Sequence, residues 1–319
     1  MLTRVLVALC GGVGAARMLS GLVRVVPGKE ITAIVNVGDD MVLHGLSISP
    51  DLDTVTYTLA GIDNRETGWG VAGESWAVMD ELARLGGEDW FRLGDRDLAT
   101  HLFRTGRLAA GEPLSAVTAS LCERRGIAVR MLPVTDDPLR TRVTLAERTA
   151  LGPAGTEVGF QDYFVRLAHG VPVRGVCFDG ADAARPAPGV MESLERGAPI
   201  VVCPSNPVVS IGPLLAVPGV EEALRARRAD VVAVSPIVAG AALKGPADRL
   251  LRELGTEASV VGVARLYASW VGTLVVDEAD AAHAGAVEAE GMRCVVAPTV
   301  MSSPERAADL AKVVLDAGR

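Results

Sequence analysis

Acidic side chains are concentrated near the ends of two predicted strands. Asp39 and Asp40 follow one apolar segment. Asp51 and Asp53 come after Pro50, at a spacing that suits the first turn of a helix. Adjacent carboxylates suit a hard divalent cation such as Mg²⁺, which takes a few carboxylates together with substrate oxygens. A solvated turn and helix capping account for some of these side chains but not for four so close together. We therefore expect metal binding or general-base catalysis here, with Asp53 as the principal candidate.

A glycine-rich turn, GGVG at 11–14, follows the first apolar segment and opens a predicted helix. Backbone N–H groups of such a turn approach a phosphate closely, with the positive end of the helix dipole behind them. Arg17 stands where the dinucleotide-binding motif GxGxxG requires its last glycine, and a P-loop would end in Gly-Lys-Ser/Thr. The alternatives are phosphate binding at Gly12, Val13 and Gly14 and a tight strand-to-helix turn, and we favour the first.

Two further loops follow predicted strands and carry polar groups on a rigid backbone. The first presents Ser205 and Asn206 between prolines. The second contains Ser235 and adds one cation, Lys244. Fixed hydroxyl and amide groups can hydrogen-bond a base or a phosphate, and a lysine can neutralise one. Turn chemistry at the edge of a sheet is the alternative for each loop alone, and it is the weaker interpretation for the pair.

The segment FRLGDRDLATH at 91–101 carries alternating charges. The exposed start of a helix with local salt bridges accounts for most of this pattern. A lone histidine such as His101 on this helix is more often a surface residue or a satisfied core residue than a catalyst.

Composition and spacing exclude several classes of protein. The five cysteines form no CxxC pair and the four histidines form no HExxH motif, which argues against zinc and predicts oxygen ligands for any metal. A net charge of −8 disfavours a nucleic-acid partner. No apolar run reaches the roughly 18 residues that span a bilayer, and the first residues show no signal-peptide pattern. We expect a cytoplasmic protein without a membrane partner.

Short apolar runs alternate with segments of helical periodicity, at 4–10, 31–37, 129–134, 173–178, 199–203, 230–234, 273–276 and 293–297. This alternation predicts an α/β fold, a Rossmann-like parallel sheet flanked by helices. Residues 74–126 instead indicate successive helices without a strand, which we interpret as a helical insertion. The polar stretch at about 136–170, with turn-forming glycines and a proline, predicts a small hairpin or lid. We expect one α/β domain over 1–319.

Six segments in order, GGVGAAR, VNVGDD, SPDLDTVTY, LGDRDLATH, PSNPVVSIGP and VSPIVAGAALKGPA, resemble the 2-phospho-L-lactate transferase family of coenzyme F-420 biosynthesis. The resemblance extends from Gly11 to about Gly245. It implies an Mg²⁺-dependent phosphotransferase that moves a phosphoenolpyruvyl or 2-phospho-L-lactyl group from a guanosine diphosphate-linked donor to the terminal ribityl hydroxyl of the deazaflavin Fo, releasing GMP. The Ala-, Arg-, Gly- and Val-rich composition is typical of actinobacteria, the branch associated with the phosphoenolpyruvyl donor.

The resemblance also assigns roles to individual residues, and we expect a homodimer. Asp53 and Arg92 would bind Fo and take part in catalysis. Asp39, Asp40 and Asp53 would hold Mg²⁺, although Asp53 cannot be both a strong metal ligand and a free base. The guanosine nucleotide would lie across Gly12, Val13, Gly14, Ser205, Asn206, Ser235 and Lys244. Such a site fits phosphoryl transfer, which depends on positioning and charge neutralisation more than on a covalent catalyst.

Two other functions compete with this one. The first is a nucleotide-sugar-binding regulatory protein similar to gluconeogenesis factor, whose Asp-Asp pair continues into Gly-Gly-Ser-Ser, whereas Asp40 here continues into MVLHGLSISPDLDT. The second is a nicotinamide-dependent oxidoreductase, which the incomplete glycine motif disfavours. The discriminating segments favour the transferase.

Overall fold

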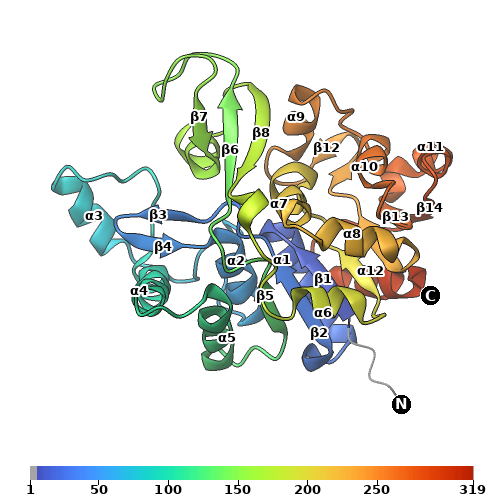
Figure 1. The fold of residues 1–319 in the computed structure, drawn as a ribbon, viewed down its shortest axis with the longest axis horizontal. Coiled ribbons are helices and arrows are strands. Elements are labelled where there is room, and N and C mark those ends of the chain that lie inside the picture. Colours follow the sequence, from blue (N-terminus) through green and yellow to red (C-terminus); the bar gives the residue numbers. More distant parts are fainter. Residues whose placement is uncertain (1–5, 319) are drawn as a thin grey trace.

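Seven parallel strands form the central sheet of the computed structural model, which describes residues 6–318 (Figure 1). The strand order is β14-β13-β10-β9-β1-β2-β5. The strands are β1 (Leu6–Cys10), β2 (Ile31–Val35), β5 (Arg130–Pro133), β9 (Ile200–Val202), β10 (Val231–Val234), β13 (Thr273–Val276) and β14 (Arg293–Val296). The chain builds outward from β1 to β5 and then returns to β9 on the other side of β1. This reversal creates the switch point at which Rossmann-like sheets bind ligands, so the predicted fold class is confirmed.

Helices cover the sheet because its inner strands are apolar on both faces and must be shielded from water. The helices of this layer are α1 (Gly12–Val25), α2 (Pro50–Leu59), α6 (Val190–Glu195), α7 (Gly212–Ala216), α8 (Val220–Ala226), α9 (Ala247–Glu253), α10 (Val260–Tyr267), α11 (Ala284–Ala289) and α12 (Pro304–Ala317). Helices α1 and α12 lie in close contact, since a Cβ built on Gly21 would come within 2.3 Å of the Ala307 carbonyl oxygen.

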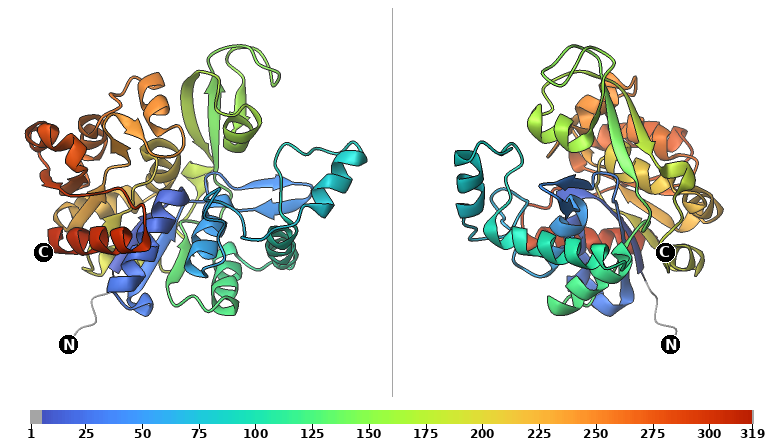
Figure 2. Two further views of the ribbon diagram at one scale, coloured as in Figure 1. Left: turned by 180° about the vertical axis from the view of Figure 1, so that it is seen from behind. Right: turned by 60° about the vertical axis from the view of Figure 1, so that its left-hand side comes forward.

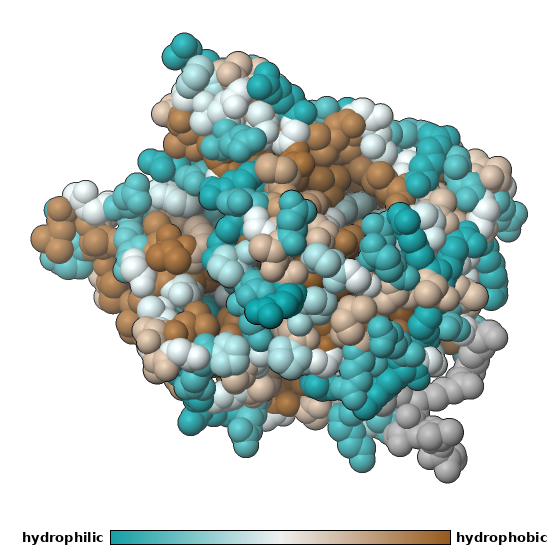
Figure 3. Space-filling view, viewed as in Figure 1, coloured by the Kyte–Doolittle hydropathy of each residue, from teal (hydrophilic) through white to brown (hydrophobic). Residues whose placement is uncertain are grey.

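A second group of elements projects from the sheet on one side (Figure 2). It comprises the hairpin of β3 (Met41–Leu43) and β4 (Leu46–Ile48) and the helices α3 (Ala77–Arg84) and α4 (Asp95–Ala109). The next helix, α5 (Leu114–Arg124), packs on the edge strand β5. Residues 74–126, all of them described, contain these three helices and no strand. A small core of Leu43, Ile48, Met79 and Leu93 joins the hairpin to α3 and to the start of α4. Figure 3 shows apolar surface where α3 forms one end of the molecule, and Val78 of α3 and Leu85, which follows the helix, are exposed.

A separate antiparallel sheet has the order β7-β6-β8, with β6 at Arg140–Leu145, β7 at Glu157–Gly159 and β8 at Val173–Asp179. Our assignment of 173–178 to the parallel sheet is therefore wrong. Alternate residues of β6 are buried, as in a sheet with one solvated face. Its buried face packs on Tyr163 and Leu250 rather than on the main core.

No single helix of residues 6–318 is both long enough and apolar enough to span a membrane. One pair of segments, Pro207–Ala216 and Val220–Ala226, reaches the required length and hydropathy only when taken together, across a bend of 94°.

Candidate active site

Three loops that follow parallel strands meet at the switch point of the sheet. The turn after β1 lies beside the loop after β9, where the Gly11 N–H donates to the Ser205 hydroxyl at 3.2 Å. The loop after β2 begins with Asn36, which is fully buried. Carboxyl ends of parallel strands share one edge of a sheet, so these loops come together although they are far apart in sequence.

Asn36 gathers a group of carboxylates at this edge. Its amide donates to Asp51 Oδ2 at 2.9 Å and to Asp39 Oδ1 at 3.2 Å. Asp40 Oδ2 accepts the Ser49 hydroxyl at 2.8 Å. All three carboxylates are at least nine-tenths buried. We call Asp39, Asp40 and Asp51 the acidic cluster.

Among the described residues, no lysine or arginine donates a hydrogen bond to the acidic cluster. Burial raises the pKa of Asp40 to about 7, against the opposing hydrogen bond from Ser49, and it raises the pKa of Asp51 to about 6. Burial, together with the like charges of Asp51 and Asp40, raises the pKa of Asp39 well above its usual value. Asp40 Oδ1 is buried without a hydrogen-bond partner. A divalent cation would supply the missing charge and a ligand for this oxygen, so the donor set fits Mg²⁺.

The small antiparallel sheet contributes groups to the same place. The Gln161 amide donates to Asp39 Oδ2 at 3.4 Å, and the Thr141 N–H donates to the Gly38 carbonyl at 2.5 Å. The Arg140 guanidinium, at the start of β6, counteracts part of the rise in the pKa of Asp39. The hairpin region therefore forms one wall of the site.

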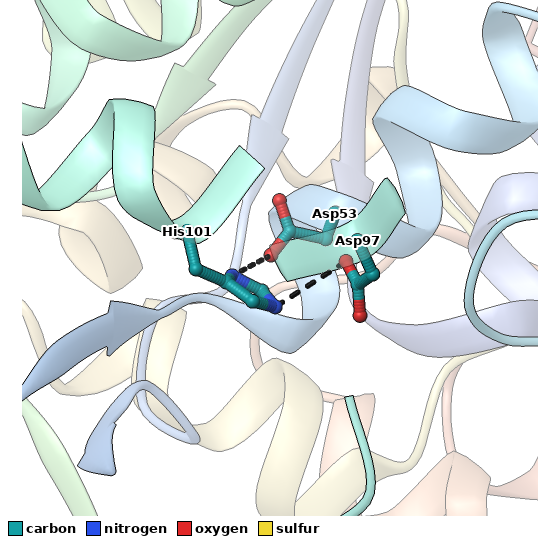
Figure 4. Close-up of side chains that lie close together, drawn as sticks. All are labelled: Asp53, Asp97 and His101. Carbon is teal, nitrogen blue, oxygen red and sulfur yellow. Dashed lines mark ion pairs between the residues drawn. The ribbon is translucent and has the colours of Figure 1, made fainter. Parts of the chain in front are cut away.

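Asp53 belongs to a second buried group, drawn in part in Figure 4. Its two oxygens pair with the two terminal nitrogens of Arg104, with Nη1 at 3.1 Å from Oδ2. His101 lies between two carboxylates, with Nδ1 3.7 Å from Asp53 Oδ2 and Nε2 3.3 Å from Asp97 Oδ1. Tyr57 donates to the same Asp97 oxygen at 2.5 Å. Ligand atoms of Asp53, Asp97 and His101 lie within 4.8 Å of one another, a spacing that could hold a metal ion.

The glycine-rich turn is confined by its neighbours. Gly12 is the first residue of α1 and has a φ of +74°, a backbone conformation that favours glycine. Its N–H donates to the Asp51 carboxylate, and this contact holds the pKa of that carboxyl below what burial alone would give. The N-terminus of α1 is thus directed at the acidic cluster.

Comparison with known proteins assigns the family. Residues 6–301 match the model described as "2-phospho-L-lactate transferase CofD". The chain belongs to the 2-phospho-L-lactate transferase family. It is 46% identical over 314 residues to a "Phosphoenolpyruvate transferase" of Kitasatospora aureofaciens, covering 97% of this chain and 96% of that protein. A protein of the same name from Mycolicibacterium smegmatis is 41% identical over 318 residues, with 97% of each chain covered.

A solved structure supports the fold of this transferase-family member. A member of the UPF0052 family from Bacillus halodurans superposes with a TM-score of 0.60 at 16% identity, covering 97% of this chain and 98% of that one. At this identity the likeness concerns the fold alone.

Several residues that we expected to bind nucleotide make local contacts in this family member. Asn206 Oδ1 accepts the Val208 and Val209 N–H groups, at 2.9 and 3.3 Å, and so caps the following turn. The Ser235 hydroxyl accepts the Ile237 N–H at 3.1 Å. Lys244 Nζ donates to the Thr67 carbonyl at 3.2 Å. These contacts hold the loops in shape without excluding a ligand.

The Arg92 side chain does not pair with Asp53 in this structure. Its guanidinium pairs with Asp80 at 2.5 Å and lies 5.3 Å from the centre of the Trp76 ring, beside helix α3. Within residues 6–318, the guanidinium that pairs with Asp53 is that of Arg104. Fo binding by Arg92 stays a prediction.

Sequence reasoning did not identify Arg104, and it set His101 aside. A signal was present, since 97, 101 and 104 follow the spacing of one helix face. Three polar side chains on the buried face of α4 require partners, and Asp53 is one of them. No comparable signal exists for Arg140 or Gln161, because their approach to Asp39 depends on how the small sheet docks.

Proposed function

We propose that this chain transfers a phosphoenolpyruvyl group from a guanosine diphosphate-linked donor to the terminal ribityl hydroxyl of the deazaflavin Fo, releasing GMP. Family membership and the name shared by the similar proteins support this assignment. The relatives' name favours the phosphoenolpyruvyl donor over the 2-phospho-L-lactyl donor. A homodimer is part of the proposal and can be checked by analytical ultracentrifugation.

The observation that carries the proposal is the acidic cluster at the switch point. Asp39 and Asp40 would hold Mg²⁺, with Asp51 beside them through Asn36. When bound, Mg²⁺ would neutralise charge on the diphosphate of the donor. The role of Asp53 as a further ligand is weakened by its ion pair with Arg104, which already engages both carboxylate oxygens.

The nucleotide would bind along the loops around the acidic cluster. Gly12, Val13 and Gly14 place the N-terminus of α1 at the diphosphate, where its N–H groups and dipole favour negative charge. The loop after β9, whose Ser205 accepts the Gly11 N–H, would contact the rest of the nucleotide through Ser205 and Asn206. The loop after β10 would contribute Ser235 and Lys244. Arg140 offers a further cation at this wall.

The acceptor would lie on the side of Asp53, with Arg92 as a further contact to Fo. A ribityl hydroxyl is a poor nucleophile at neutral pH and needs an oriented acceptor for its hydrogen bond. Asp53 is a fixed carboxylate suited to this task. The neighbours of the buried His101 among the described residues are Arg104, Asp53 and Asp97, and none of them is a serine or cysteine nucleophile, which favours direct transfer over a covalent enzyme intermediate.

The test is a product analysis. Purified protein is mixed with Fo and Mg²⁺ and with each guanosine-linked donor in turn, and the products are identified by mass spectrometry. We expect the phosphoenolpyruvyl adduct of Fo together with GMP. The proposal would be refuted if none of the donors gave an Fo adduct.

A further inference from the structure

We infer that Arg104 is the resident cation of the group formed by Asp53, Asp97 and His101, and that it acts as a positioning residue for Asp53. Divalent metal ions would then bind at the acidic cluster and not at this group. The catalytic consequence rests on the proposed function, whereas the location of metal binding does not.

The first argument is the way Arg104 engages Asp53. Both terminal guanidinium nitrogens pair with both carboxylate oxygens, a bidentate geometry that fixes distance and orientation. Both side chains are at least nine-tenths buried, and Nη1 also donates to the Ser47 carbonyl at 3.2 Å. A divalent cation at Asp53 would have to displace a guanidinium that has few other acceptors nearby.

The second argument concerns His101. A guanidinium can only donate hydrogen bonds, and Arg104 Nη1 lies 3.2 Å from His101 Nδ1. Nδ1 therefore accepts, which puts the imidazole proton on Nε2, the nitrogen that faces Asp97 Oδ1. Neither ring nitrogen then offers a free lone pair to a metal ion. Asp53 and His101 instead bind the Arg104 guanidinium, and Asp97 lies on the other side of the His101 ring.

The two buried groups thus differ in charge. Asp53 is paired with the Arg104 guanidinium through both of its oxygens, and Asp97 accepts a hydrogen bond from the Tyr57 hydroxyl. The acidic cluster has no guanidinium or ammonium hydrogen bond among the described residues, and its unpartnered buried atom, Asp40 Oδ1, is an acceptor. The unpartnered buried atoms of the other group, Arg104 Nε and His101 Nε2, are donors in the protonation described above and offer no lone pair to a metal ion. Charge balance therefore directs a divalent cation to the acidic cluster.

Arg104 also links Asp53 to the reaction site through helix α2. Asp51 and Asp53 both lie in the first turn of α2, and Asp51 reaches Asn36 and the turn that opens α1. Because Arg104 holds the Asp53 carboxylate in one orientation, the lone pairs that Arg104 does not use point in a fixed direction. Loosening this clamp should slow the chemical step more than it weakens nucleotide binding.

The metal experiment uses the full chain without substrates. Mn²⁺ binding is measured by calorimetry and electron paramagnetic resonance for the wild type and for Asp97→Asn, His101→Asn and Asp40→Asn. We expect Asp97→Asn and His101→Asn to keep the wild-type stoichiometry with affinity within about twofold, and Asp40→Asn to weaken binding at least ~10-fold. Loss of a bound Mn²⁺ in Asp97→Asn or His101→Asn, with Asp40→Asn unaffected, would overturn the inference.

The positioning experiment compares Arg104→Lys with the double variant Asp53→Asn/Arg104→Met. Lysine keeps the charge but not the bidentate geometry. The double variant removes both members of the Asp53–Arg104 ion pair together, so neither is left buried without the other, which guards against a folding failure. We expect Arg104→Lys to lower kcat at least ~10-fold while KM for the guanosine-linked donor stays within about twofold. The double variant should match the kcat of Asp53→Asn alone, because residues acting as one unit are not additive.

Wild-type kcat in Arg104→Lys, or multiplicative losses in the double variant, would overturn the positioning role. The two proposals fail separately. A wild-type protein that transfers nothing to Fo refutes the proposed function, while the Mn²⁺ titrations still decide where the metal binds.

Discussion

Gly14 of helix α1 lies directly against the backbone of Pro204, such that a Cβ built on Gly14 would come within 2.1 Å of the Pro204 carbonyl oxygen. Backbone cannot give way as the end of a flexible side chain can. The turn after β1 and the loop after β9 can therefore lie this close together only because Gly14 has no side chain. Both segments border the acidic cluster, so this contact sets the width of the proposed nucleotide site.

Gly14→Ala should separate the two loops. We expect a loss of about 1–3 kcal/mol in the free energy of unfolding, as for other overpacked sites, and a weaker affinity for GDP. Denaturant unfolding and calorimetric GDP titration measure the two effects. Gly106→Ala on α4 is the matched control, since its Cβ would meet no atom within 4 Å and alanine favours a helix. Equal GDP affinity in Gly14→Ala and the wild type would contradict the prediction.

Transfer activity should require a divalent cation held by the acidic cluster. Excess chelator should abolish turnover and added Mg²⁺ should restore it, because burial raises the pKa of Asp39 and Asp40 and a divalent cation would balance their charge. Asp40→Asn should raise the Mg²⁺ concentration for half-maximal rate at least ~10-fold. Steady-state rates against free Mg²⁺ provide the measurement, and undiminished turnover in chelator would refute the requirement.

The metal-free protein should lose stability as the pH rises. The folded pKa of Asp40, about 7, lies above the value near 4 expected for the unfolded chain, so folding binds a proton in this interval. The contribution to stability is complete below about pH 4 and disappears as the pH passes 7. A shift of about three units corresponds to at most about 4 kcal/mol.

Thermal unfolding in chelator at constant ionic strength tests this dependence. The midpoint should fall from pH 5 to pH 8 more steeply in the wild type than in Asp40→Asn. Mg²⁺ should stabilise the wild type more at pH 8 than at pH 5, since it competes with the proton for the carboxylates. Identical pH profiles for the two proteins would count against the raised pKa.

Asp53→Asn should lower the transfer rate at least ~100-fold while the affinity for GDP changes little, because the amide loses the charge that Arg104 pairs with. Single-turnover rates and GDP calorimetry separate the two quantities. Circular dichroism confirms that the variant is folded. Turnover close to that of the wild type would leave Asp53 with a capping role only.

Transfer should proceed by one in-line displacement with inversion at phosphorus. The prediction follows from the surroundings of His101, which contacts Arg104, Asp53 and Asp97 and, among the described residues, no serine or cysteine that it could activate. Stereochemical analysis with a chiral phosphate donor provides the measurement. Retention of configuration, or a trapped phospho-enzyme, would contradict direct displacement.

The parallel sheet and the place of the acidic cluster could both be predicted from the sequence. Fully apolar runs such as 31–35 indicate strands buried on both faces, and residues that follow such strands share one edge of the sheet. Asp39 and Asp40 could be placed beside the glycine-rich turn for this reason alone. The segment 173–178 has a similar apolar content, and only its pairing with β6 showed that it belongs to another sheet.

The partners of the buried charges were decided by the tertiary structure. Asp53 and Arg104 are 51 positions apart, and the sequence does not encode which carboxylate a buried guanidinium will meet. The docking of α4 against α2 brings them together, just as the docking of the small sheet brings Gln161 to Asp39. Local periodicity determines which face of an element is buried. Which polar groups meet on that face depends on long-range packing. A buried charge needs a partner, and the docking of elements that are distant in sequence determines which partner lies close enough to bind it.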